Sequence, residues 1–370
     1  MLNRFINLAT AWTTVAAFFA FGGAWLTGLT SPLLAALLFA WLVGVIVWAA
    51  FGVVHEAEEL AHLLGEPYGT LILTLSIVII EVALISAVML GAKDAPTLGR
   101  DTMFAVVMIV LNGVVGVGLL IGGLRHHEQE YNLEGAMAYL SVLTPLTLIA
   151  LVLPNFTTST ADGTLTTVQA LAFSVFTIAL YGIFLVLQTG RHSGYFIGPT
   201  LAESEHVAGL TTPPSGRPTL AAALPHIALL LAYILPIVIL AKSLALVLDF
   251  GLAALGAPIA LGGVLIAMVV FMPEGISALR AILADELQRA VNLCLGAVTS
   301  TLGLTVPAVL AIGLLTGETV TLGLSAANMV LLAITLIVSV LTFSGTRTTM
   351  LDGAVHLTVF LVFLVLVFSP

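Results

Sequence analysis

Long apolar stretches follow one another along the chain, with only short breaks between them. A helix needs about 20 mainly apolar residues to cross a bilayer. Ending each stretch at charged, Gly or Pro clusters gives eleven candidate spans. They cover residues 8–29, 32–54, 67–91, 101–123, 136–153, 166–188, 220–241, 243–271, 287–315, 319–343 and 350–369, with the eighth expected to begin near Gly256 and to continue through Pro273. The sequence therefore predicts an all-α integral membrane protein.

The composition supports a chain surrounded by lipid. Hydrophobic residues make up 60% of the sequence and charged residues only 8%, whereas soluble chains carry about 25% charged residues. The net charge is −9 and basic residues form no long run, which excludes nucleic-acid binding. The expected partners are the lipid bilayer, inorganic cations and protons, and the sequence favours neither a monomer nor an oligomer.

The longest break between spans, residues 189–219, is rich in Pro and Gly and predicts a cytoplasmic linker. It separates an N-terminal helix (1–30) and a five-helix segment (31–188) from a second five-helix segment (220–370). Because five is odd, the two segments enter the membrane in opposite orientations, as in inverted-repeat transporters. A cytoplasmic N-terminus places seven of the ten Lys and Arg residues inside, as the positive-inside rule requires.

One glutamate lies deep within a span of each half. Glu81 is in the third span and Glu274 in the eighth. A carboxylate at the middle of a span costs about 2.5 to 3.5 kcal/mol on insertion scales, so it faces a cavity or a partner. Either each glutamate is protonated or hydrogen-bonded for packing alone, or the two halves bring both into one binding site.

The span after each glutamate carries polar residues at corresponding positions. Asn112 follows Glu81 by 31 residues, and correction for a loop four residues shorter places its equivalent at Thr301. Thr301 closes a polar cluster with Thr299 and Ser300. Oxygen ligands of this kind suit hard cations such as Ca²⁺. We therefore expect a site with Glu81 and Glu274 as cation and proton ligands, completed by Asn112, Thr299, Ser300 and Thr301, and no resident cofactor.

The residues around Glu274 predict a broken helix. Pro273 has no backbone N–H and frees the carbonyl of Val269, while Gly275 loosens the same turn. Broken helices supply backbone carbonyl ligands in other transporters.

Two buried carboxylates cannot easily cross a membrane uncompensated, so they cross protonated or loaded with a cation. That asymmetry predicts a secondary antiporter rather than an enzyme. An intramembrane hydrolase would need a deep His, whereas His226 and His356 are expected near span ends. A cation channel or an uncoupled cation transporter is the alternative, because acidic rings also select cations.

Further His and Glu residues gather outside the expected site. His55, Glu58, Glu59 and His62 form either a solvated helix end or, with His126, His127 and Glu128, a cytoplasmic patch that regulates by sensing cations or pH. Asp352 and His356 are expected at the membrane interface, with Asp352 as the alternative proton-path residue.

Four segments resemble the bacterial ChaA-type branch of the cation/calcium exchanger superfamily, namely Gly65–Leu75, Ile109–Val115, Gly122–Glu128 and Leu287–Gly296. The resemblance runs from about His55 to Pro370. It implies eleven transmembrane helices, two inverted repeats, and proton-coupled export of Ca²⁺, Na⁺ or K⁺ across the bacterial cytoplasmic (inner) membrane.

By family motif, Glu81 and Glu274 match the acidic residues of the two repeats, and Asn112, Ser300 and Thr301 match polar positions of the partner helices. The family's usual Gly-Asn before each glutamate is replaced by Ile79-Ile80 and Met272-Pro273. Having fewer side-chain oxygens than the family pattern favours a range of cations broader than Ca²⁺ alone.

Overall fold

The computed structural model describes residues 2–27, 29–64, 68–91, 96–160, 163–198 and 220–369. Within them, nine helices are long and apolar enough to cross a membrane, and two shorter apolar stretches, Thr74–Ala87 and Ala326–Thr342, lie in further helices. These eleven helices confirm the predicted all-α membrane fold. The chain divides into two compact units, and each contains segments from both halves of the sequence.

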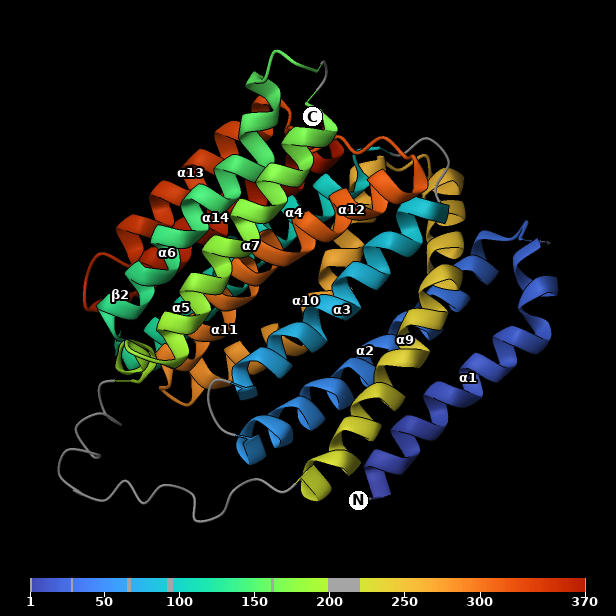
Figure 1. Ribbon diagram of the computed structural model, residues 1–370, viewed down its shortest axis with the longest axis horizontal. Coiled ribbons are helices and arrows are strands. Elements are labelled where there is room, and N and C mark those ends of the chain that lie inside the picture. The colour runs from blue at the N-terminus through green and yellow to red at the C-terminus, as the bar shows by residue number, and fades with distance from the viewer. Residues whose placement is uncertain are drawn as a thin grey trace. The chain divides into compact units, whose positions relative to one another are not determined.

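The first unit contains Met1–Thr102, Pro218–Pro273 and Ala311–Val320. Its long helices are α1 (Leu2–Thr27), α2 (Pro32–Leu64), α3 (Tyr68–Gly91), α9 (Leu220–Leu255) and most of α10 (Ile259–Leu283). The α2 helix packs along α9, and both contact α1 and α3 (Figure 1). The first helices of the two sequence halves, α2 and α9, are therefore direct neighbours.

The second unit contains Met103–Arg217, Glu274–Leu310 and Thr321–Pro370. One long helix is formed by α4 (Leu98–Met108), the π-helical turn η1 (Ile109–Val114) and α5 (Val115–His126), and another by α11 (Leu287–Ser300), the π-helical turn η5 (Thr301–Thr305) and α12 (Val306–Thr316). The remaining elements are α6 (Leu133–Thr147), η2 (Leu148–Val152), η3 (Leu153–Phe156), α7 (Thr167–Thr189), η4 (Ser193–Phe196), α13 (Ala326–Thr342) and α14 (Met350–Phe368). The closest packing joins α14 to α5 and η1, and α11 to α6 (Figure 1).

Two three-residue strands join the ends of helices in the second unit. The strands β1 (Glu128–Glu130) and β2 (Arg347–Thr349) pair antiparallel, with Gln129 opposite Thr348. The α14 helix then begins with a capping box, in which Asp352 accepts hydrogen bonds from the backbone N–H and the hydroxyl of Thr349. Asp352 thus stabilises the start of a helix.

Two predicted boundaries are wrong. The α9 helix continues through Lys242 and Asp249 to Leu255, so no break separates residues 241 and 243. Residues 318–325 have no regular secondary structure. Leu322 and Leu324 are buried there, and the backbone N–H groups of Leu322 and Gly323 donate to the carbonyl of Gly163. An apolar segment can thus be buried without being a helix.

The predicted helix break at Pro273 and Gly275 is also wrong, because α10 runs from Ile259 to Leu283 with Pro273 inside it. A proline in a helix still removes one hydrogen bond, here the one to the carbonyl of Val269. The hydrogen bond to the carbonyl of Val269 is therefore lost, as predicted, but the helix continues past Pro273. Most of the predicted linker, residues 199–219, lies outside the described residues.

Candidate functional site

Both predicted glutamates are buried in apolar helices. The side chain of Glu81 in α3 is 2% exposed, and that of Glu274 in α10 is 4% exposed. Glu81 belongs to the first compact unit, and Glu274 is the first residue of a segment of the second unit. Burial removes water from a carboxylate, so each must be compensated by a proton, a cation or polar neighbours. This is the property expected of an exchangeable cation and proton ligand.

The predicted partner residues lie at π-helical turns. Asn112 is in η1 and Thr301 opens η5. Each follows the first residue of its long helix, Leu98 or Leu287, by 14 positions. A π-helical turn is rare and often marks a functional site, because it changes the helix register and the backbone hydrogen bonds. Residues paired by sequence alone therefore share the same unusual local structure.

The polar cluster of the second half is buried as well. Thr299, Ser300 and Thr301 are at most 5% exposed. Thr299 donates to the carbonyl of Leu295 at 2.6 Å and Ser300 to that of Ala297 at 2.9 Å. Both hydroxyl protons are thus used in hydrogen bonds within the helix, so each hydroxyl oxygen can act only as an acceptor or ligand toward other groups. Because α11 packs against η1, the second unit places this cluster and Asn112 on neighbouring elements.

Asn112 is held by residues that the sequence did not indicate. Its side-chain nitrogen donates to the hydroxyl of Thr335 at 2.8 Å, and its oxygen lies 3.1 Å from Nδ1 of His356. Nε2 of His356 lies 3.0 Å from the hydroxyl of Thr342. His356 is 0% exposed and therefore enclosed by protein, while its position at the membrane interface stays a prediction.

Glycines bring α14 against α5 where this contact is made. A Cβ on Gly353 would lie 2.3 Å from the backbone nitrogen of Leu120, and one on Gly116 would lie 2.8 Å from that of Leu357. Real Cβ atoms essentially never approach so closely. Small residues allow this packing in membrane helices, and it places His356, one turn after Gly353, beside Asn112.

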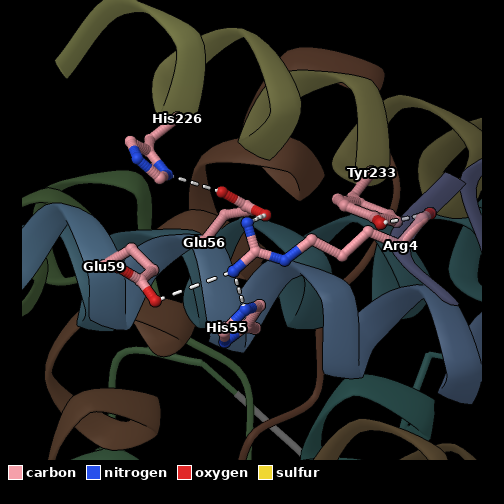
Figure 2. A network of polar contacts seen from close by, with 6 residues as sticks. All are labelled: Arg4, His55, Glu56, Glu59, His226 and Tyr233. Atoms are coloured by element: carbon pink, nitrogen blue, oxygen red, sulfur yellow. Dashed lines mark hydrogen bonds and ion pairs between the residues drawn. The ribbon is translucent and has the colours of Figure 1, made fainter. Parts of the chain in front are cut away.

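The predicted patch around His55 is part of a larger network in the first unit, shown in Figure 2. The Arg4 guanidinium contacts Glu56 at 3.4 Å, Glu59 at 3.6 Å, and the ring of His55. Nδ1 of His226 lies 2.7 Å from the other oxygen of Glu56. The Glu56 side chain is 0% exposed, so this residue, which was not among the predicted ones, is the centre of the network. It joins α1, α2 and α9.

Glu58, half-buried, lies on the same helix, and the side chain of His62 is outside the described part of the chain. At Glu56, the structure therefore has a buried ionic contact instead of a solvated helix end.

The other half of the predicted patch lies in the second unit. His126 makes a 3.3 Å hydrogen bond to the carbonyl of Leu283, and His127 follows α5 with φ at +69°. Glu128 and Glu130 both pair with Arg347, at 2.9 and 2.7 Å, and these hydrogen bonds raise the pKa of Arg347. The two acidic groups therefore bind an exposed arginine across the strand pair.

Among the described residues, no group of three or more His, Cys, Asp and Glu side chains is arranged to hold a metal ion. The candidate site contributes two carboxylates, Glu81 in α3 and Glu274 in α10.

Comparison with known proteins extends over nearly the whole chain. The sequence profile described as sodium/calcium exchanger protein matches residues 34–190 and 225–369. The y4hA protein of Sinorhizobium fredii is 42% identical over 88% of this chain and 87% of its own length. The sodium-potassium/proton antiporter ChaA of Escherichia coli is 39% identical over 93% of this chain and 92% of its own. The structure of YfkE has a similar fold, with a TM-score of 0.72 at 17% identity, covering 99% of this chain and 100% of YfkE.

The long apolar helices and these similarities define a multi-pass membrane transporter of the cation-exchanger class. The chain belongs to the sodium/calcium exchanger protein family. The resemblance seen in the sequence is thereby confirmed.

Proposed function

We propose that the protein is a proton-coupled antiporter that exports Ca²⁺, and also Na⁺ and K⁺, in exchange for H⁺. Transport takes place by alternating access at a mid-membrane site built on Glu81 and Glu274, with oxygen ligands from Asn112, Thr299, Ser300 and Thr301. The observation that carries the proposal is the burial of one glutamate in each half of the chain, 2% and 4% exposed, in helices made mainly of apolar residues.

The coupling follows from electrostatics. A carboxylate in a medium of low dielectric constant favours its neutral form, and two nearby carboxylates titrate as a pair. Protons or a cation can neutralise the site, whereas the empty charged site is strongly disfavoured while it reorients. Cations and protons therefore exchange for one another.

The breadth of cations rests on two supports. Neutral oxygens and only two carboxylates suit monovalent as well as divalent cations. The relative ChaA is named a sodium-potassium/proton antiporter, and YfkE is named a Ca²⁺/H⁺ antiporter. A site that accepts all three cations agrees with both names.

The proposal is tested in everted membrane vesicles from cells without other cation/proton exchangers. Dequenching of an acridine dye reports proton release when Ca²⁺, Na⁺ or K⁺ is added separately at several pH values. We expect a response to each cation, lost in Glu81→Gln and Glu274→Gln and kept in the control Glu318→Gln, which changes an exposed carboxylate outside the helices. Wild-type transport in both buried-glutamate variants would contradict the site, and a response to Ca²⁺ alone would contradict the broad range.

A channel lined by acidic residues is the second candidate, since it uses the same buried carboxylates. The two mechanisms differ in how flux depends on protons. At fixed voltage the flux of an antiporter follows the pH gradient, whereas channel flux does not. A reversal potential that is independent of the pH gradient would favour the channel.

We also propose that the N-terminus faces the cytoplasm of a bacterium, in the inner membrane, with the C-terminus outside. This orientation rests on the distribution of Lys and Arg between the loops. Alkaline phosphatase fused after residue 369 would be active, and green fluorescent protein at the same place would be dark. The opposite pair of results would reverse the topology.

A further inference from the structure

His356 is a fully buried histidine in a chain of hydrogen bonds that ends at a proposed cation ligand. It lies on α14 between Asn112 of η1 and Thr342 of α13, and all three belong to the second compact unit. Its side chain is 0% exposed and that of Asn112 is 0% exposed. A buried imidazole with a hydrogen-bond partner at each ring nitrogen has a fixed orientation.

The direction of the hydrogen bonds fixes the amide of Asn112. The hydroxyl of Thr335 donates to the carbonyl of Leu331 at 2.8 Å, so its oxygen is free to accept. It accepts from the side-chain NH₂ of Asn112 at 2.8 Å. The amide oxygen of Asn112 consequently faces His356, and an amide oxygen can only accept.

This orientation in turn fixes the histidine. Nδ1 of His356, which is 3.1 Å from that amide oxygen, must carry a hydrogen. Nε2 is then the acceptor for the hydroxyl of Thr342 at 3.0 Å. Within the described part of the chain, that is the hydrogen bond found for this hydroxyl. Of the two neutral tautomers, the network therefore selects the one with hydrogen on Nδ1.

We infer that His356 is a positioning residue for cation binding, holding the amide of Asn112 so that the second lone pair of its oxygen is available to the cation. The inference rests on the proposed function, because Asn112 is a ligand only in that proposal. In this arrangement both ring nitrogens are used in hydrogen bonds to Asn112 and Thr342, so we assign His356 a positioning role and no share in carrying the transported proton. Thr335 and Thr342, both on α13, form the two ends of this series of hydrogen bonds.

Two substitutions separate the two sides of the imidazole. An asparagine amide nitrogen reaches the place of Nδ1, whereas a glutamine amide reaches the place of Nε2. His356→Asn therefore keeps the donor to Asn112, and His356→Gln keeps only the contact to Thr342. The control is Thr358→Ala on the same helix, which removes an exposed hydroxyl that donates to the carbonyl of Ala354.

The measurement is the cation concentration for half-maximal dye dequenching, taken with Ca²⁺, Na⁺ and K⁺ separately at pH 7, 8 and 9. We expect His356→Gln to raise it by roughly 2- to 12-fold, the range for loss of one hydrogen bond, with the maximal rate unchanged. His356→Asn and Thr358→Ala should stay within about 2-fold of the wild type, with the wild-type pH profile. Equal effects of the two His356 variants, or a shifted pH profile in His356→Asn, would overturn the inference.

Thr342→Val provides a second test if His356→Gln fails to fold. It keeps the shape of the side chain while removing the donor to Nε2, so the half-maximal concentration should again rise, and Thr342→Ser should restore it. An unchanged value in Thr342→Val overturns the assignment of the imidazole. Asn112→Ala is measured in parallel. Wild-type transport in Asn112→Ala rejects the proposed site, whereas lost transport there with wild-type His356 variants rejects the positioning role alone.

Discussion

Gly353→Ala tests whether close contact between α5 and α14 sets the geometry at Asn112. The added Cβ would lie 2.3 Å from the backbone nitrogen of Leu120, and ordinary contact begins at 3.4 Å, so the helices must separate by about 1 Å. The 3.1 Å contact between His356 and Asn112 would then lengthen to about 4 Å, beyond hydrogen-bonding distance. Overpacking and the lost bond together cost roughly 2 to 4 kcal/mol.

We expect Gly353→Ala to lower the thermal unfolding midpoint of the purified protein and to raise the half-maximal cation concentration in vesicles. The matched control is Gly182→Ala in α7, where a Cβ meets nothing within 4 Å and alanine should stabilise the helix slightly. Both quantities are measured on the same preparations. Unchanged stability and unchanged transport in Gly353→Ala would show that the reasoning from the close contact is wrong.

Three further changes have defined outcomes. Glu81→Gln and Glu274→Gln should abolish transport without lowering the amount of protein in the membrane, measured by immunoblot, because a neutral amide is no harder to insert than a carboxylate; reduced amounts would point to a packing role. Arg4→Gln should lower the free energy of unfolding by roughly 1 to 3 kcal/mol, since it removes a partner that is 34% exposed from the fully buried Glu56. Adding Glu56→Gln should recover most of this loss, measured by thermal unfolding. No recovery would contradict the pairing. Burial, with Asp352 nearby, raises the pKa of Tyr131 to about 12, so unfolding releases the phenol proton above about pH 10. The difference in unfolding free energy between wild type and Tyr131→Phe should therefore stay constant below pH 10 and fall from pH 10 to 12. A fall at lower pH would exclude this cause.

The number of helices and the burial of Glu81 and Glu274 could be predicted because both follow from local sequence. Apolar length reports a spanning helix, and a carboxylate within such a length needs a reason to be there. The correspondence between Asn112 and Thr301 also followed from spacing, and both lie at π-helical turns. The turns themselves have no sequence signature that was recognised.

The residues that sequence analysis missed depend on contacts between distant parts of the chain. His356 and Asn112 are 244 positions apart, and Glu56 and His226 are 170 apart. Burial of a histidine at the start of a span follows from the neighbouring glycine contact and not from its own position in the sequence. Gly116 and Gly353 were the available signal, since small residues in facing helices indicate close packing.

The boundary errors have a different origin. Lys242 suggested a loop, yet α9 continues as one helix of 36 residues, about 54 Å long and longer than the hydrocarbon core of a bilayer, which is about 30 Å thick. A charged residue inside the sequence of a long helix can therefore lie beyond the lipid without ending the helix.

The most direct test of proton-coupled exchange at the two glutamates uses purified protein in sealed proteoliposomes containing a pH-sensitive dye. An imposed gradient of Ca²⁺, Na⁺ or K⁺, with the membrane potential clamped, should drive protons against their own gradient in the wild type. The same gradient should move no protons in Glu274→Gln. Proton movement that only ever follows the proton gradient, or uphill movement that persists in Glu274→Gln, would contradict antiport at this site.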